Sequence, residues 1–232
     1  VDEYLLERAS LGQLSASSVV VIRRVLRQLA RHVGGGQLDR AELTSWLASG
    51  GVGPATVKSR LTKSRPFVRW LLERGHLDHD PTAGIPVPRR AEQLPRALPV
   101  DAVARLLHAC PDARARLMVS LMVQMGLRVG EVAAATMTDV DWEGRVLRIR
   151  GKGGRGDITR AVPFTAEAWD ALEAYLVEVG RRPSGALIVS WNRPGEGIQG
   201  HTISKLVRRW MALAGLKVHA YDGVSAHALR PY

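Results

Sequence analysis

The most informative stretch of this 232-residue chain is GLRVGEV, at residues 126–132. It follows a predicted helix that Asp112 can cap and that Gly126 is expected to end. A further helix is predicted to begin next to Arg128. Backbone N–H groups at a helix start attract anions, so an arginine at this point suits a phosphate. The same spacing also fits a surface arginine that pairs with Glu131 three residues later.

A β-hairpin is predicted downstream of this motif. Residues 146–150 alternate like a half-buried strand, and residues 158–164 are expected to form the returning strand. The turn between them, GKGGRGD at residues 151–157, carries Lys152 among four glycines. A lysine at a flexible hairpin tip can reach into a groove, but most such lysines only make the surface soluble.

The last motif is HALR at residues 227–230. If this stretch is helical, His227 and Arg230 project from one face because they are three residues apart. A histidine and an arginine together can contact a phosphate and help to move a proton. The alternative is a frayed chain end with no specific role.

Residues 1–80 are predicted to be all-helical. Ser15 or Ser17 can cap a helix whose apolar residues recur at helical spacing. Four arginines lie largely off that apolar stripe: Arg23, Arg24, Arg27 and Arg31. Pro54 suits the first turn of a later helix, in which Pro66 predicts either a kink or a division into two helices.

A basic run occupies this later helix, and its cations are Lys58, Arg60, Lys63, Arg65 and Arg69. Such a run is a candidate for following the phosphates of a nucleic acid, with a solvated helix face as the alternative. Prolines recur through residues 81–98 and favour an extended linker between two domains. Arg89 and Arg90 lie in the middle of this linker, where a basic strap could pass close to a nucleic acid.

The composition supports a polyanionic partner. The chain has 33 Lys and Arg against 22 Asp and Glu, so its net charge is +11. This excess favours nucleic acid, although solubility or a GC-rich genome would also explain it. The apolar runs are too short to span a bilayer, and the lone Cys110 excludes both an internal disulfide framework and a cysteine-based metal cluster. We expect a cytoplasmic protein without a membrane partner.

The order of these features resembles the tyrosine recombinases, the phage-integrase family. That resemblance rests on GLRVGEV, on GKG at residues 151–153 and on HALR, and it runs over nearly the whole chain. It implies a mixed, mainly α fold with two domains. Residues 1–80 would form a helical, SAM-like core-binding domain, residues 81–98 a basic linker, and residues 99–232 an α+β catalytic domain with a small antiparallel sheet, incomplete at its C-terminal end.

The resemblance also assigns roles to individual residues. Arg128 and Arg230 would hold the scissile phosphate of double-stranded DNA and stabilise the transition state. Lys152 would be the general acid for the departing 5′ oxygen, His227 would assist proton movement, and Glu131 would orient Arg128. The family needs neither a metal ion nor a nucleotide cofactor. It works as a tetramer on DNA, so a homo-oligomer is an open expectation for this chain.

One expected residue has no counterpart in the sequence. The family's nucleophile is a tyrosine several helical turns beyond the His-x-x-Arg motif, whereas Tyr232 follows Arg230 almost immediately. Tyr175 is predicted to be a helix residue near the core. We therefore expect a truncated integrase that binds DNA and does not complete strand cleavage. Two alternatives remain: a non-catalytic protein that binds recombination sites, and a metal-independent nuclease that uses His227 and Lys152.

Overall fold

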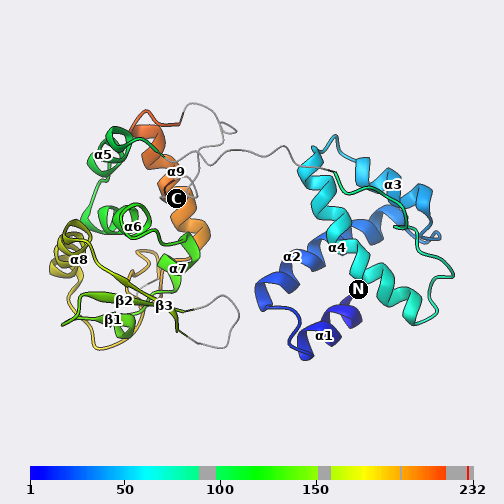
Figure 1. Ribbon diagram of the computed structural model, residues 1–232, viewed down its shortest axis with the longest axis horizontal. Helices are drawn as coiled ribbons and strands as arrows, with labels where there is room; N and C mark the ends of the chain where they lie inside the picture. Colours follow the sequence, from blue (N-terminus) through cyan, green and yellow to red (C-terminus); the bar gives the residue numbers. More distant parts are fainter. Residues whose placement is uncertain (89–97, 151–157, 194, 218–228, 230–232) are drawn as a thin grey trace. The chain divides into compact units, whose positions relative to one another are not determined.

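The chain folds into two compact units, Val1–Gln93 and Leu94–Tyr232, and the division falls within the proline-rich stretch at residues 81–98. The computed structural model describes residues 1–88, 98–150, 158–193, 195–217 and 229 (Figure 1). Arg89 and Arg90 lie outside these residues. Each unit has its own apolar core, so each is described by itself.

Unit 1 is all-helical. Its helices are α1 (Asp2–Ser10), α2 (Ala16–Val33), α3 (Arg40–Ala48) and α4 (Pro54–Glu73). The hydroxyl of Ser15 caps α2 by accepting a hydrogen bond from the backbone N–H of Ser18. Helix α2 packs against each of the other three helices and buries Leu26 and Leu29 among them. Helix α2 lies at the centre of unit 1 because its apolar face packs against the other three helices. Its opposite face is exposed to solvent.

Helix α4 is one continuous helix through Pro66. The expectation of two separate helices is therefore wrong. A proline removes one backbone hydrogen bond, here the one that the carbonyl of Thr62 would accept. Thr62 and Pro66 are both exposed, so water can satisfy that carbonyl. The buried side of the helix, with Leu61 and Val68, supplies the packing that keeps it intact.

The first residues of the proline-rich stretch are packed against unit 1. Thr82 is buried. The backbone carbonyl of Ala83 accepts a hydrogen bond from Arg40 at 2.6 Å, and that of Ile85 accepts one from Arg65 at 2.6 Å. The first part of the linker, as far as Ile85, is therefore fixed to the surface of unit 1.

Unit 2 combines helices with a three-stranded antiparallel sheet in the order β1-β2-β3. Its elements are α5 (Val100–His108), α6 (Ala113–Val123), α7 (Val129–Ala134), the 3-10 helix η1 (Met137–Asp139), β1 (Val140–Asp141), β2 (Val146–Arg150), β3 (Ile158–Pro163), α8 (Ala166–Val179) and α9 (Gly200–Leu213). Helix α6 is almost wholly buried and packs against α8. The buried residues of unit 2 form one continuous apolar cluster.

The predicted fold class is confirmed: the chain is mainly helical, with a small antiparallel sheet in its second part. Tyr175 is a buried residue of α8, as expected, and its hydroxyl accepts the backbone N–H of Val189 at 3.0 Å. No helix within the described residues has the length and apolar content needed to cross a membrane. No group of three or more acidic, histidine or cysteine residues in the same part of the chain is arranged to hold a metal ion.

Arg60 holds the end of one helix against another. From α4 it donates hydrogen bonds to the carbonyls of Trp46 at 2.6 Å and Ser49 at 3.0 Å. Its guanidinium also lies 5.3 Å from the centre of the Trp46 ring, in a cation–π contact. These carbonyls lie at the C-terminal end of α3, where backbone acceptors have no partner within the helix.

We predict that Arg60→Ala lowers the free energy of unfolding by about 1 to 3 kcal/mol, because buried carbonyl acceptors lose a charged donor. Urea unfolding followed by tryptophan fluorescence would measure the change. Lys58→Ala is the matched control, since Lys58 is exposed on the same helix and should change stability by less than about 0.5 kcal/mol. Equal stability of the two variants would contradict the structural role of Arg60.

Candidate functional site

Glu131, in the first turn of α7, binds two arginines at once. Its Oε1 accepts hydrogen bonds from Arg128 Nη1 at 2.9 Å and Arg160 Nη1 at 3.0 Å. Its Oε2 accepts one from the backbone N–H of Arg128 at 2.7 Å and one from Arg160 Nη2 at 2.8 Å. Arg160 therefore makes a bidentate pair, while Arg128 is held through both its side chain and its backbone.

The local sequence explains where Arg128 lies. Gly126 adopts a positive φ of 65°, which lets the chain turn sharply after α6. Leu127 is then buried and its backbone N–H donates to the carbonyl of Leu121 at 3.1 Å. Val132 is buried on the other side. Between these two anchors the Arg128 side chain is 54% exposed, so one edge of its guanidinium is held and the rest faces solvent.

The electrostatics of this group keep Glu131 ionised. Burial raises the pKa of its carboxyl, but hydrogen bonds from Arg160 and Arg128 outweigh burial and lower the pKa to about 2. The hydrogen bond to Glu131 correspondingly raises the pKa of Arg160. Glu131, Arg128 and Arg160 together carry one net positive charge. The Arg128 guanidinium is the part of this group that faces solvent.

Arg160 is a site residue that the sequence reasoning missed. It pairs with Ile149 across β2 and β3, and Ile149 is buried. The register therefore places Arg160 on the sheet face that packs against the core of unit 2. The sequence did contain a signal for this role. Arg160 and the half-buried Val162 are two residues apart on one strand, so they lie on the same face of the sheet. A charge on such a face needs a partner, and Glu131 provides it.

The end of β2 is fixed by a second acidic side chain, that of Asp139. Asp139 is almost fully buried and accepts hydrogen bonds from the backbone N–H of Thr136 at 2.9 Å and from Arg150 Nε at 2.8 Å. Burial raises the pKa of Asp139, but hydrogen bonds from the Thr136 hydroxyl, Arg150 and the Thr136 backbone N–H lower it overall. Arg150 is the last residue of β2, so the chain enters residues 151–157 from an anchored position.

The structure places two of the residues that the family resemblance singled out, Arg128 and Glu131, and it brings them into contact. Lys152, His227 and Arg230 lie outside the described residues, as does Tyr232. Leu229, between the last two motif residues, is buried in the apolar cluster of unit 2. Leu127, which precedes Arg128, belongs to the same cluster.

The basic run of unit 1 divides into two kinds of side chain. Lys58 and Arg69 are exposed, and among the described residues neither has a hydrogen-bond or ion-pair partner. The other three bind within unit 1: Arg60 to the end of α3, Lys63 to the hydroxyl of Ser59, and Arg65 to the carbonyl of Ile85. Lys58 and Arg69 are therefore the members most available to a ligand.

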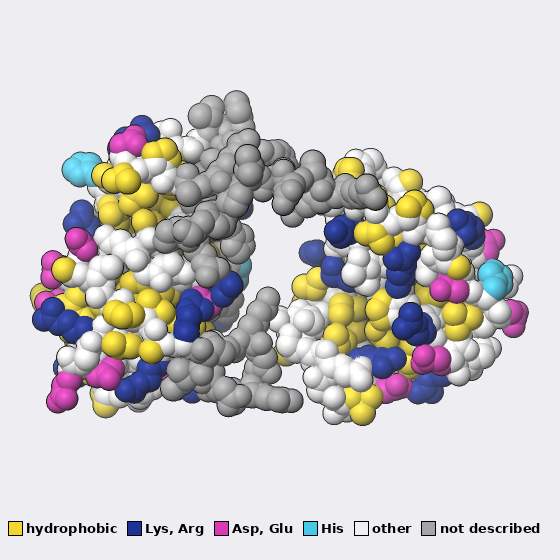
Figure 2. Space-filling view, in the orientation of Figure 1, with side chains coloured by type: hydrophobic (Ala, Val, Ile, Leu, Met, Phe, Trp, Pro, Cys, Tyr) yellow, Lys and Arg dark blue, Asp and Glu magenta, His cyan; other side chains and the backbone are white. Residues whose placement is uncertain are grey.

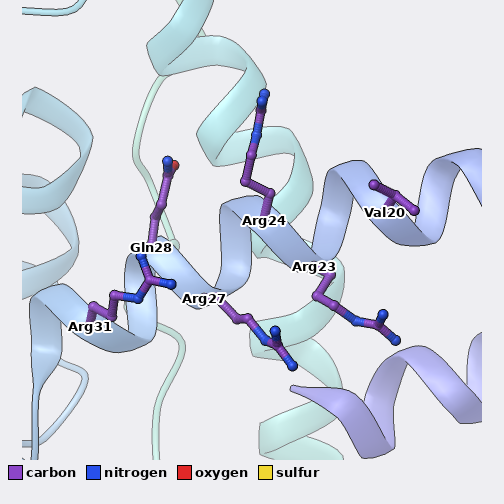
Figure 3. Close-up of a pocket in the computed structure, with 6 residues that line it drawn as sticks. All are labelled: Val20, Arg23, Arg24, Arg27, Gln28 and Arg31. Atoms are coloured by element: carbon purple, nitrogen blue, oxygen red, sulfur yellow. The ribbon is translucent and has the colours of Figure 1, made fainter.

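A second basic face, on α2, was not among the predicted binding residues. An open hollow of about 280 Å³ follows one side of this helix (Figure 3). Its lining residues are Val20, Arg23, Arg24, Arg27, Gln28 and Arg31, which we call the α2 groove. The available signal was the complete absence of acidic residues from α2, a helix of 18 residues.

Comparisons with known proteins agree with this architecture. Residues 96–232 match the Phage integrase family over more than half of the chain, and the chain belongs to that family. The tyrosine recombinase XerC of Chromobacterium violaceum is 36% identical over 200 residues, which cover 81% of this chain and 64% of the relative. The XerC of Mycobacterium tuberculosis (strain ATCC 25177 / H37Ra) is 36% identical over 157 residues, or 62% of this chain and 51% of the relative. The chain thus spans between about half and two thirds of these relatives.

Solved structures show the same fold. A lambda integrase dimer bound to a COC′ core site has a TM-score of 0.78 at 18% identity, covering 99% of this chain and 66% of that one. The Tn1549 transposon integrase in complex with circular intermediate DNA has a TM-score of 0.72 at 15% identity, covering 98% and 82%. The predicted family membership is confirmed.

Glu131→Gln should lower the free energy of unfolding at pH 7 by about 1 to 3 kcal/mol, because the two arginines lose their shared anion. The folded-state pKa of about 2 lies below the ordinary value of 4.5. The stabilisation is therefore complete above about pH 4.5 and is lost as the pH falls toward 2. Urea unfolding of both proteins at pH 7 and pH 3 would measure this.

The difference between wild type and Glu131→Gln should shrink at pH 3 to less than half of its value at pH 7. Glu143→Gln is the control, because Glu143 is exposed and has no ion pair among the described residues. It should match wild type at both pH values. A stability difference for Glu131→Gln that does not depend on pH would argue against the charged pair.

Proposed function

We propose that this chain binds duplex DNA as part of a tyrosine-type site-specific recombinase. The observation that carries the proposal is the anchored Arg128. Glu131 holds one edge of its guanidinium, while the side chain remains 54% exposed. The remaining N–H donors of such a guanidinium group can bind phosphate oxygens. Its orientation is set before the ligand arrives, which is the requirement for stabilising a phosphoryl transition state.

The proposed chemistry involves four residues around one phosphodiester. Arg128 and Arg230 would bind its non-bridging oxygens, and His227 would assist proton movement. In strand cleavage a tyrosine hydroxyl attacks phosphorus and forms a 3′-phosphotyrosine bond. The bond from phosphorus to the 5′ oxygen breaks, and Lys152 would give that oxygen a proton. The roles of Lys152, His227 and Arg230 are supported by their positions in the family motifs.

The nucleophile is not among the described tyrosines. Tyr4 and Tyr175 are 4% and 0% exposed, so neither hydroxyl can approach a DNA phosphate. Burial also raises the pKa of both phenols, which disfavours the phenolate. Neither tyrosine follows the HALR motif in the sequence. Of the two tyrosines outside the described residues, Tyr221 precedes that motif and Tyr232 follows Arg230 almost immediately. We therefore propose that these 232 residues by themselves bind DNA and form no covalent link to it.

Relatives suggest how the protein assembles. The solved structures of lambda integrase include a dimer bound to a core site and a tetramer bound to a Holliday junction. We propose that this chain likewise engages DNA together with further copies of itself. In unit 1, the exposed Lys58 and Arg69 of α4 are the proposed phosphate contacts.

The 232-residue protein should retard a DNA duplex in a mobility-shift assay. It should yield no covalent adduct and no free hydrolysed ends on a nicked suicide substrate. The adduct would be detected by denaturing electrophoresis. Hydrolysed ends without an adduct would support a nuclease instead, and an adduct would show that a nucleophile is present in these residues. Failure to retard any duplex would contradict the proposal.

Reversing the charge of Lys58 and Arg69 together should weaken DNA binding at least tenfold near 0.1 M salt and flatten its salt dependence. Each lost phosphate contact reduces the slope of log K against log salt by about 0.9. The control reverses Arg105 and Arg193, which pair with Asp101 and Glu196 in unit 2. This control changes the net charge equally and should leave the slope unaltered. An unaltered slope for the first variant would remove α4 from the interface.

A further inference from the structure

The α2 groove presents four arginines on one side of a single helix. Its residues follow one another at steps of three, one, three, one and three positions, which places them on the solvent face opposite the buried Leu26 and Leu29. The stretch from Val20 to Arg31 is about 16 Å long at 1.5 Å per residue. A surface of this length can contact several successive phosphates of a DNA strand.

The four arginines are not equivalent. Asp2, at the start of α1, binds two of them: its Oδ1 lies 3.1 Å from Arg23 Nε, and its Oδ2 lies 3.0 Å from Arg27 Nη2. In Figure 3 the side chains of Arg23 and Arg27 extend together to one side of α2. The Arg24 side chain starts from the same solvent-facing surface but extends away from those of Arg23 and Arg27 (Figure 3). Within the described part of the chain, neither Arg24 nor Arg31 has an acidic partner.

These ion pairs can exchange with an external anion. The side chains are 60% exposed for Asp2, 43% for Arg23 and 52% for Arg27. Exposed pairs of this kind contribute little to stability, and salt screens them. A phosphate that enters the groove can therefore take the place of the carboxylate without breaking the core of unit 1. Tyr4 and Leu5, which are buried, hold α1 in position independently of Asp2.

We propose that Asp2 competes with the phosphate backbone of duplex DNA for Arg23 and Arg27 of the α2 groove. This inference rests on the proposed function, because it assumes that unit 1 meets DNA. Asp2 would neutralise Arg23 and Arg27, two of the four cations, until a phosphate displaces it. We call this internal competition the Asp2 brake. Without the brake the chain would bind DNA more tightly and with a steeper dependence on salt.

Two observations favour DNA over an acidic protein as the occupant. Helix α2 packs against α4, whose exposed Lys58 and Arg69 add to the positive charge of the same unit. All four cations of the groove are arginines, whose forked donors match phosphate oxygens. In the space-filling view, Lys and Arg side chains are spread over the visible face of unit 1, with acidic side chains among them (Figure 2).

The test compares Asp2→Asn with Glu3→Gln in the full 232-residue chain. Both variants remove one negative charge from the first turn of α1, but Glu3 pairs with Arg74, outside the groove, at 3.3 Å. Binding to a labelled duplex is followed by fluorescence anisotropy between 50 and 300 mM salt. Asp2→Asn should tighten binding about threefold to tenfold at the lowest salt and steepen the salt slope by about one to two. Glu3→Gln should change affinity by less than about twofold and leave the slope unaltered.

A mutant cycle separates the ion pair from any change in folding. In a chain that carries Arg23→Gln and Arg27→Gln, Asp2→Asn should no longer tighten binding, because both arginines that pair with Asp2 are already removed. The double arginine variant should itself bind more weakly than wild type. Circular dichroism of each variant establishes that the helices are intact. A gain that persists in this background would overturn the proposal.

The remaining outcomes are also decisive. Equal effects of Asp2→Asn and Glu3→Gln on a protein that binds DNA would overturn the brake and leave the proposed function standing. A wild-type chain that binds no duplex at any salt would overturn both. An equal gain by Asp2→Asn toward a polyglutamate peptide would show that the groove takes any anion, which would overturn its assignment to DNA.

Discussion

The carboxylate of Glu131 is the centre on which the geometry of the candidate site in unit 2 depends. It lies where three pieces of chain meet: the turn after α6, the short helix α7 and the strand β3. Arg160 makes a bidentate pair from the sheet, and Arg128 is held by its backbone and its side chain. Without this anion, two guanidinium groups would repel each other at the edge of the core. With it, one arginine ties the sheet to α7 and the other is presented to solvent in a fixed orientation.

The basic side chains of unit 1 occur in three different settings. Arg60 and Arg65 satisfy backbone carbonyls and so stabilise helix ends and the start of the linker. Arg23 and Arg27 are paired with an exposed acid that an external anion can displace. Lys58 and Arg69 are simply exposed. A net charge of +11 therefore overstates the charge that is free to meet a polyanion, because the fold uses part of it internally.

Much of the secondary structure could be predicted because its signals are local. The cap at Asp112, the strand at residues 146–150 and the burial of Tyr175 all follow from residue type and periodicity, and all are confirmed. The expected division into two helices at Pro66 was wrong, because packing of the buried side keeps the long helix continuous through the proline. Arg160 was missed because its role depends on cross-strand register, which brings it to an acid 29 residues away.

The sequence by itself determined the family, the two-part organisation of helices and sheet, and the pairing of Arg128 with Glu131. Each of these depends on motifs or periodic patterns whose own residues are close together in the chain. Only the tertiary structure decided which cations are free and which are engaged. That distinction depends on contacts such as Asp2 with Arg27, Arg60 with Trp46 and Arg160 with Glu131. Their partners are 25, 14 and 29 residues apart, and no periodic pattern in a sequence reports which of its charges will meet after folding.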